Sequence, residues 1–149
     1  MTPFITAGAG FLLAVLWFDL MFDVQVLRHR GHDVPEQALA SIAGYYRRVT
    51  TAARPMNRLV AAVMFATIGT IIAQLARGDR PRWAGWLSLV LTGGAVLLAA
   101  SRTVPAAVRL GERRDSQQQQ SGLAKSIARD HVVCAVAIVA VLAVELAAT

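Results

Sequence analysis

The stretch Phe4–Phe22 reads FITAGAGFLLAVLWFDLMF, and it decides the fold of this chain. Its 19 residues include one charged side chain, Asp19. A helix of about 20 apolar residues is what crosses the roughly 30 Å hydrocarbon core of a bilayer. Three more stretches of 17 to 19 residues have the same apolar character: 59–75, 83–101 and 132–148. The sequence therefore predicts an all-α integral membrane protein built as a four-helix bundle.

The composition supports this class. Hydrophobic residues make up 56% of the chain and charged residues only 16%, which is too apolar for an ordinary soluble domain. Four spans with their connectors use the 149 residues, so we expect a single transmembrane domain over 1–149. The first stretch lacks the basic region of a signal peptide, since no Lys or Arg precedes Arg28. We therefore interpret it as a retained span.

The net charge of +6 is distributed unevenly along the chain. Twelve Lys and Arg residues lie in the first and third connectors, and three lie in the second. The positive-inside rule then predicts a multi-pass protein of the cell membrane whose two termini both lie outside the cytoplasm. Anionic lipid headgroups are the expected partners of these basic residues. Because no nucleic-acid-binding motif accompanies them, we expect no nucleic acid partner.

Two connectors have local patterns of their own. The run Asp33–Glu36 has the order of a helix N-cap, a proline in the first turn and a capping box. Together with the apolar residues that follow on one face, it predicts an amphipathic helix over about 34–53. This helix is expected between spans one and two, either at the cytoplasmic surface or as an extension of span two. The polar, glutamine-rich segment of about 111–122 is expected to be mobile.

The predicted topology gathers polar side chains at one end of the bundle, where spans one and three end and spans two and four begin. These residues are Asp19, Asp23, Asn57, Arg58, Arg102, Arg129, Asp130 and His131. Asp19 is the sharpest signal, because a carboxylate at hydrocarbon depth costs several kcal/mol unless it is paired or hydrated. Arg58 and Arg102 are its candidate partners. Asp19 is then either half of a structural ion pair or part of a ligand or proton site.

His131 is the only histidine near a span. Its ordinary pKa lies near physiological pH, so its imidazole is a candidate general base. The alternative is an interfacial histidine that anchors a helix end. His29 and His32 have a spacing that metal ligands use, but no second motif accompanies them, and we expect neither a metal nor another cofactor. At the opposite end of the bundle, Glu145 is expected among the lipid headgroups.

The segments that carry these polar residues resemble the small four-helix membrane proteins grouped with anthrone oxygenases. The similarity lies in Tyr46–Arg48, Arg54–Arg58, Arg102–Pro105 and Arg129–His131. The resemblance implies a cofactor-independent oxygenation of a planar aromatic substrate, in which a base forms an electron-rich anion and a cation stabilises that anion. The catalytic residues it implies are His131, Asp19 and Arg58, and the substrate-binding residues are Asn57, Arg102, Tyr46, Arg48 and Asp130.

Three classes of function remain open at this point. The first is the oxygenase-like enzyme, which predicts a closed pocket for a hydrophobic small molecule at the cytoplasmic end. The second is a small proton-coupled transporter, which predicts a dimer with its Asp19 side chains in a shared cavity. The third is a non-catalytic accessory subunit, which predicts that the polar residues are tied up in internal pairs. The sequence also leaves open whether the assembled form is a homo-oligomer or a larger membrane complex.

Overall fold

The structure is a computed structural model that describes residues 1–29, 31, 33–78 and 81–148, without the side chain of Arg54. In the order of the chain, the helices are α1 (Thr2–Leu27), α2 (Glu36–Arg47), the π-helical turn η1 (Arg48–Ala52), α3 (Arg54–Arg77), α4 (Arg82–Leu98), the π-helical turn η2 (Ala99–Thr103), α5 (Val104–Glu112) and α6 (Gln117–Ala147). The described ranges contain no strand.

Four of these helical segments are long and apolar enough to cross a membrane. They are Thr2–Leu27, Pro55–Arg77, Arg82–Glu112 and Gln117–Ala147. The predicted all-α membrane architecture is therefore confirmed. The helical segments extend beyond the apolar stretches found in the sequence, because helical backbone continues into the polar residues that flank each stretch.

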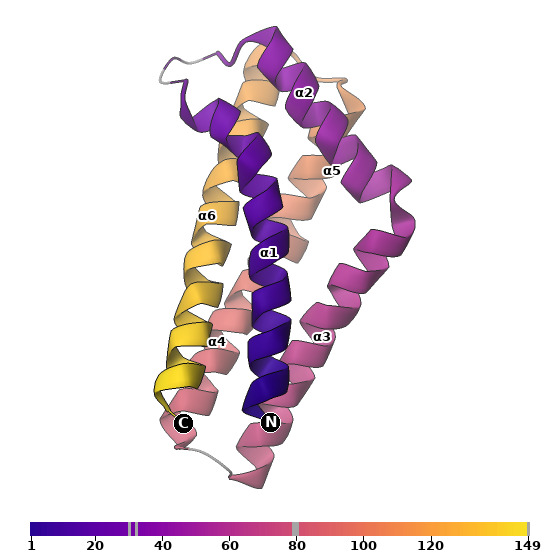
Figure 1. Cartoon of the computed structure of the whole chain (residues 1–149). Helices are drawn as coiled ribbons and strands as arrows, with labels where there is room; N and C mark the ends of the chain where they lie inside the picture. The colour runs from indigo at the N-terminus through magenta and orange to yellow at the C-terminus, as the bar shows by residue number, and fades with distance from the viewer. Residues whose placement is uncertain (30, 32, 79–80, 149) are drawn as a thin grey trace.

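The long helices run side by side, with both termini, the end of α3 and the start of α4 at one end of the molecule (Figure 1). We call this the terminal end. At the opposite end, α2 and α5 lie against each other over the last turns of α1 and the first turns of α6 (Figure 1). We call this the α2 end. Two groups of buried apolar residues hold these parts together: one at the α2 end around Leu39, Ile42, Leu110 and Ile127, and one between the long helices around Ile5, Leu12, Ile71, Ile138 and Val141.

The start of α2 differs from the prediction. The N-cap residue is Pro35 rather than Asp33, and its side chain makes no capping hydrogen bond. The preceding residue, Val34, is instead fixed by α6, because its backbone N–H donates to Ser121 Oγ at 2.9 Å and its carbonyl accepts from Gln117 Nε2 at 3.2 Å. Docking onto α6 therefore replaces the predicted capping box.

Much of the glutamine-rich segment of about 111–122 forms the start of α6. Ser116 caps this helix with a capping box, in which its side chain accepts from the Gln119 backbone and the Gln119 side chain accepts from the Ser116 backbone. Gln120 and Ser121 are buried. Ser121 accepts from the Val34 backbone and Gln120 Nε2 donates to the Asp115 carbonyl, contacts that a composition-based interpretation does not detect.

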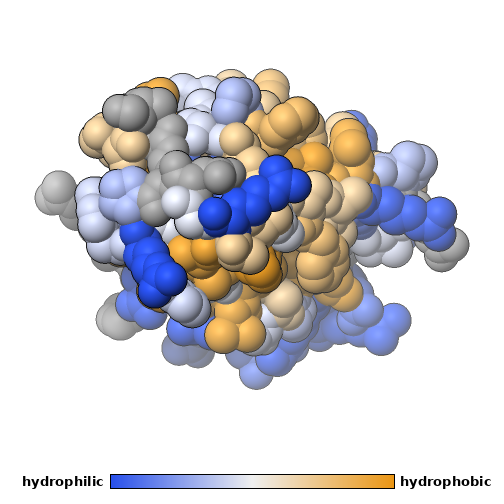
Figure 2. Space-filling model, turned by 90° about the horizontal axis from the view of Figure 1, so that it is seen from below, coloured by the Kyte–Doolittle hydropathy of each residue, from blue (hydrophilic) through white to orange (hydrophobic). Residues whose placement is uncertain are grey.

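Large apolar side chains remain on the outside of the long helices. Phe4, Trp17, Phe65 and Leu97 are each at least 66% exposed. Such side chains on the outside of the long helices are suited to hydrocarbon rather than water, in agreement with the four long apolar helices. Seen from the terminal end, hydrophobic side chains gather over the centre and right of the view, and hydrophilic ones lie at the left and around the edges (Figure 2).

Close packing of α1 on α3 depends on Gly8, and this generates a first prediction. A Cβ at Gly8 would collide with Thr67 Oγ1 and lie 3.3 Å from Thr67 Cβ, whereas a Cβ at Gly10 meets nothing within 4 Å. We expect Gly8→Ala to lower the free energy of unfolding in detergent by about 1–3 kcal/mol, the usual cost of overpacking. Gly10→Ala is the matched control and should leave stability unchanged or slightly raised. Equal stability of the two variants would contradict the packing described for α1 and α3.

Candidate functional site

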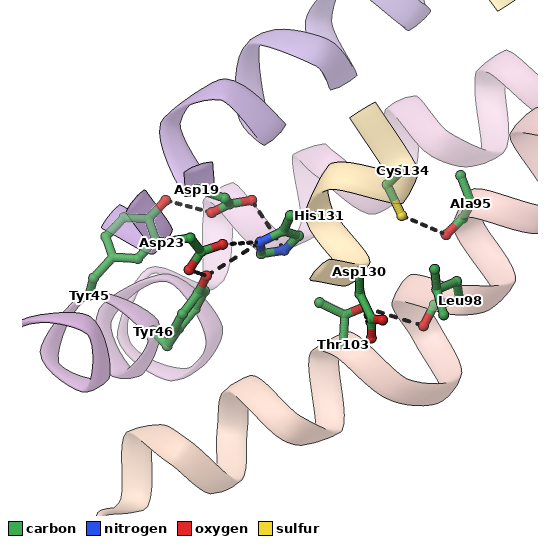
Figure 3. A network of polar contacts seen from close by, with 10 residues as sticks. All are labelled: Asp19, Asp23, Tyr45, Tyr46, Ala95, Leu98, Thr103, Asp130, His131 and Cys134. Atoms are coloured by element: carbon green, nitrogen blue, oxygen red, sulfur yellow. Dashed lines mark hydrogen bonds and ion pairs between the residues drawn. The ribbon is translucent and has the colours of Figure 1, made fainter. Parts of the chain in front are cut away.

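A polar network joins α1, α2 and α6 at the α2 end (Figure 3). Its centre is Asp23, which is fully buried. Asp23 Oδ1 accepts a hydrogen bond from the Tyr46 hydroxyl at 2.6 Å, and Asp23 Oδ2 lies 2.7 Å from His131 Nδ1. Because a carboxylate only accepts, the imidazole proton at this contact sits on Nδ1. Both oxygens of Asp23 are therefore engaged, one by α2 and one by α6.

Asp19 lies one helical turn from Asp23 on the same face of α1. Its Oδ1 accepts from the Tyr45 hydroxyl at 2.7 Å, and its Oδ2 lies 3.8 Å from His131 Nε2. The ring of Tyr45 is stacked on Phe22, with 4.0 Å between ring centroids, which fixes the direction of its hydroxyl. The predicted arginine partner is not observed within the described part of the chain. A tyrosine from α2 and a histidine from α6 take that place.

Both tyrosines of the network stay protonated. Burial is the largest cause that raises the pKa of Tyr45, followed by its hydrogen bond to Asp19. For Tyr46, burial again comes first in raising the pKa, followed by the charge of Asp23. Each phenol therefore remains a hydrogen-bond donor to its carboxylate.

Asp130 belongs to a separate, smaller cluster. Its Oδ1 lies 3.8 Å from Arg102 Nη2, and its Oδ2 accepts from Thr103 Oγ1 at 3.4 Å. Although Asp130 precedes His131 in the sequence, Asp23 rather than Asp130 contacts the imidazole. Adjacent residues of a helix point about 100° apart, which separates the two clusters.

The other predicted site residues have different surroundings. Arg48 and Arg58 are exposed, and within the described residues neither makes an ion pair. Asn57 instead serves the local fold, because its Nδ2 donates to the Thr50 carbonyl at 2.7 Å and so ties the start of α3 to η1. Of the eight predicted residues, the structure brings His131, Asp19 and Tyr46 together and places Arg102 with Asp130. Asp23, Tyr45 and Thr103 were not among the eight. For Asp23, the sequence offered one signal: its four-residue spacing from Asp19, which places both carboxylates on one face of a helix.

The network borders a cavity of about 570 Å³ that all the helices help to line. Most of the lining is apolar, including Val60, Met64 and Ile138, while Asp19, Tyr46, Asn57 and His131 supply polar groups. Phe18, Met56 and Val104 also line it and are at least half exposed, so they mark where the cavity reaches the outer surface of the bundle. The cavity can therefore admit an apolar molecule from outside the bundle and hold it beside these polar groups.

A second buried polar cluster lies toward the terminal end. Glu145 on α6 is 1% exposed and accepts from Ser88 Oγ at 2.9 Å and from Gln74 Nε2 at 3.4 Å. The predicted position of Glu145 among the headgroups is therefore wrong, because partners on α3 and α4 allow its burial. No group of three or more His, Cys, Asp or Glu suited to a metal occurs in the described ranges, and His32 of the weak metal pattern lies outside them.

Comparison with known proteins gives one match. The family model SHR3_chaperone, described as ER membrane protein SH3, matches residues 1–148. Searches of curated proteins and of solved structures give no match.

This match corrects three predictions made from the sequence. The resemblance to anthrone oxygenases is wrong, because the model that covers the chain belongs to a different family. The description as a chaperone contradicts both the oxygenase-like enzyme and the proton-coupled transporter, and it is only partly compatible with an accessory subunit. The description as an ER membrane protein contradicts the predicted place in the cell membrane, whereas the four long apolar helices support a multi-pass protein.

The two tyrosines give a matched pair of variants for the network. Tyr46→Phe leaves one oxygen of a fully buried carboxylate without a donor, which we expect to cost about 1–3 kcal/mol of unfolding free energy. Tyr45→Phe should cost less, because the Asp19 side chain is 14% exposed and borders the cavity. Chemical unfolding of both variants in detergent measures the difference. A larger loss for Tyr45→Phe would contradict the central position of Asp23.

The raised tyrosine pKa values generate a spectroscopic prediction. The chain has only two tyrosines, and both are in the network. At about pH 11, one unit above the ordinary tyrosine pKa of about 10, we expect no tyrosinate absorbance from the folded protein and about nine-tenths of the full absorbance after denaturation. Since folding raises these pKa values, the tyrosines stabilise the fold fully below about pH 10 and progressively less at higher pH. Tyrosinate absorbance from folded protein at this pH would show that the phenols are not held as described.

Proposed function

Because this chain belongs to the SHR3 chaperone family of ER membrane proteins, we propose that it is a membrane-embedded chaperone that assists the packing of other membrane proteins. The observation that carries the proposal is the length of the match, residues 1–148, which includes all the helices described above. We also propose the ER membrane as its location, on the basis of the same family description.

The surface of the long helices supports contact with the spans of other proteins. Gly10, Gly69 and Gly94 are exposed, and a Cβ at any of them would meet nothing within 4 Å. Small residues allow helix backbones to approach closely inside a membrane, where the hydrophobic effect does not drive association. These glycines take no part in internal packing of the kind that Gly8 makes, so they leave room for a partner helix.

Internal pairing of the polar groups suits a transient interaction. Interhelical hydrogen bonds are a source of affinity between spans in a bilayer, at about 1–2 kcal/mol each in model peptides. Asp23, Tyr46 and Glu145 are buried and already bonded within the bundle. A client helix would therefore meet a mainly apolar surface and bind through packing alone, which favours release once the client has found its own partners.

We propose a structural role for most of the candidate residues. Tyr46 and His131 hold α2 and α6 against α1 through Asp23, and Asp130 with Arg102 joins α6 to η2. Arg48 and Arg58 are exposed at the α2 end, where the start of α3 meets the membrane boundary, and they suit contact with anionic headgroups. None of these roles requires a chemical step.

Removal of the protein from its own cell tests the proposal. We expect multi-span membrane proteins made in ER membranes without this chain to insert but to aggregate at least about twofold more, because their spans pack without assistance. Native gel electrophoresis of solubilised membranes measures the aggregated fraction. Re-expression of the chain should return this fraction to its original value. Single-span proteins are the control and should be unaffected, since they have no internal span packing to assist. An unchanged aggregated fraction for every multi-span protein tested would refute the proposal.

A further inference from the structure

The cavity beside the polar network combines an apolar body with a negatively charged end. From this combination we propose that it binds a lipophilic amine, a molecule with one hydrocarbon tail and one protonated amino group. The proposal is independent of the chaperone function, because it concerns a ligand that the purified chain can bind on its own.

The carboxylate oxygens of Asp19 and Asp23 differ in how fully they are hydrogen-bonded within the protein. Both oxygens of Asp23 are engaged at 2.6 and 2.7 Å, and Asp23 is fully buried. Asp19 has one engaged oxygen, Oδ1, which accepts from Tyr45 at 2.7 Å. Its other oxygen, Oδ2, has the imidazole of His131 at 3.8 Å, which is too long for a hydrogen bond. Asp19 lines the cavity, so Oδ2 is the acceptor that a ligand can use.

The end of the cavity that adjoins the polar network carries a net negative charge. Asp19 and Asp23 from α1 face one imidazole from α6, so the acids outnumber the base even when His131 is protonated. The groups from α2 are phenols that stay neutral, because burial raises the pKa of both. The nearby Arg58 is exposed and does not line the cavity. A cation is therefore favoured at this end and an anion is disfavoured.

The size and the apolar lining of the cavity suit a small molecule with a hydrocarbon tail. A cavity of about 570 Å³ lies within the range of about 300–1,000 Å³ that small-molecule sites occupy. A helix with its side chains is about 10–12 Å wide, so such a volume admits little more than one turn of a client span. Apolar side chains make up most of the remaining wall, among them Met56, Val60 and Met64 of α3 and Leu12 and Leu16 of α1. A hydrocarbon tail fits these walls, and the exposed Phe18 and Met56 mark its route of entry.

Three ten-carbon probes that differ only in the headgroup test the proposal: decylamine, decanol and decanoate. With the full chain in a non-ionic detergent at neutral pH, we expect decylamine to raise the thermal midpoint at concentrations at least about tenfold lower than decanol or decanoate requires. A tenfold preference is the lower limit for one hydrogen bond to a charged group. Equal effects of decylamine and decanol would overturn the proposal.

Two variants test the position of the site. Asp19→Asn keeps an acceptor for Tyr45 but removes the charge, and it should abolish the preference for decylamine over decanol. Glu36→Gln is the matched control, because it removes one carboxylate from an exposed residue paired with Arg113 outside the cavity, and it should leave the preference unchanged. Equal effects of the two variants would show that decylamine responds to overall charge only, and would overturn the site.

A third variant keeps the proposal testable if Asp19→Asn does not fold. Ala61 lines the cavity, and Ala61→Phe takes up space there without changing any charged group. It should weaken decylamine and decanol by similar factors of at least about tenfold, because both tails lose the same room. Undiminished binding of decylamine by a folded Ala61→Phe protein would place the ligand elsewhere and overturn the proposal.

Discussion

The fold depends on the pairing of a carboxylate that water cannot reach. Asp23 sits near the end of the first span and is fully buried, and such a group is costly unless its oxygens are bonded. Its two partners, Tyr46 and His131, come from helices far along the chain. Their contacts require α2 to turn back over the end of α1 and α6 to run beside it. The hydrogen bonding of Asp23 therefore constrains how α2 and α6 are arranged at the α2 end.

The four spans could be predicted from the sequence because their signal is local and strong. An apolar stretch such as Phe4–Phe22 satisfies its backbone within its own helix, so its conformation does not depend on neighbours. The helix starts could not be predicted in the same way. Asp33–Glu36 has the pattern of a capping box, but the Val34 backbone finds better-placed partners on α6. The fate of a polar terminus depends on what tertiary structure places beside it, and a single sequence does not show this.

The candidate site was predictable by residue type but not by pairing. Asp19 and His131 stood out because ionisable side chains are rare inside spans, and both are in the network. The arginines chosen as partners were wrong for a physical reason: a long, charged side chain reaches outward to water or headgroups, as Arg58 does. The misleading family resemblance has the same origin, because arginines and prolines at span ends are features that membrane insertion favours in unrelated proteins.

Polar contacts restrain the walls of the cavity unequally. α6 is held to α1 and α2 by His131 at its middle, and to α4 by Glu145 near its C-terminal end. α3 shares in the Glu145 cluster through Gln74, but at its other end the side-chain hydrogen bond of Asn57 reaches only to the adjoining turn η1. The first half of α3 faces the cavity with Met56 and Met64, whose unbranched side chains adapt to irregular partners. The first half of α3 is therefore the wall that can change shape at least cost, and the rigid carboxylates opposite it fix where a ligand's charged group must lie.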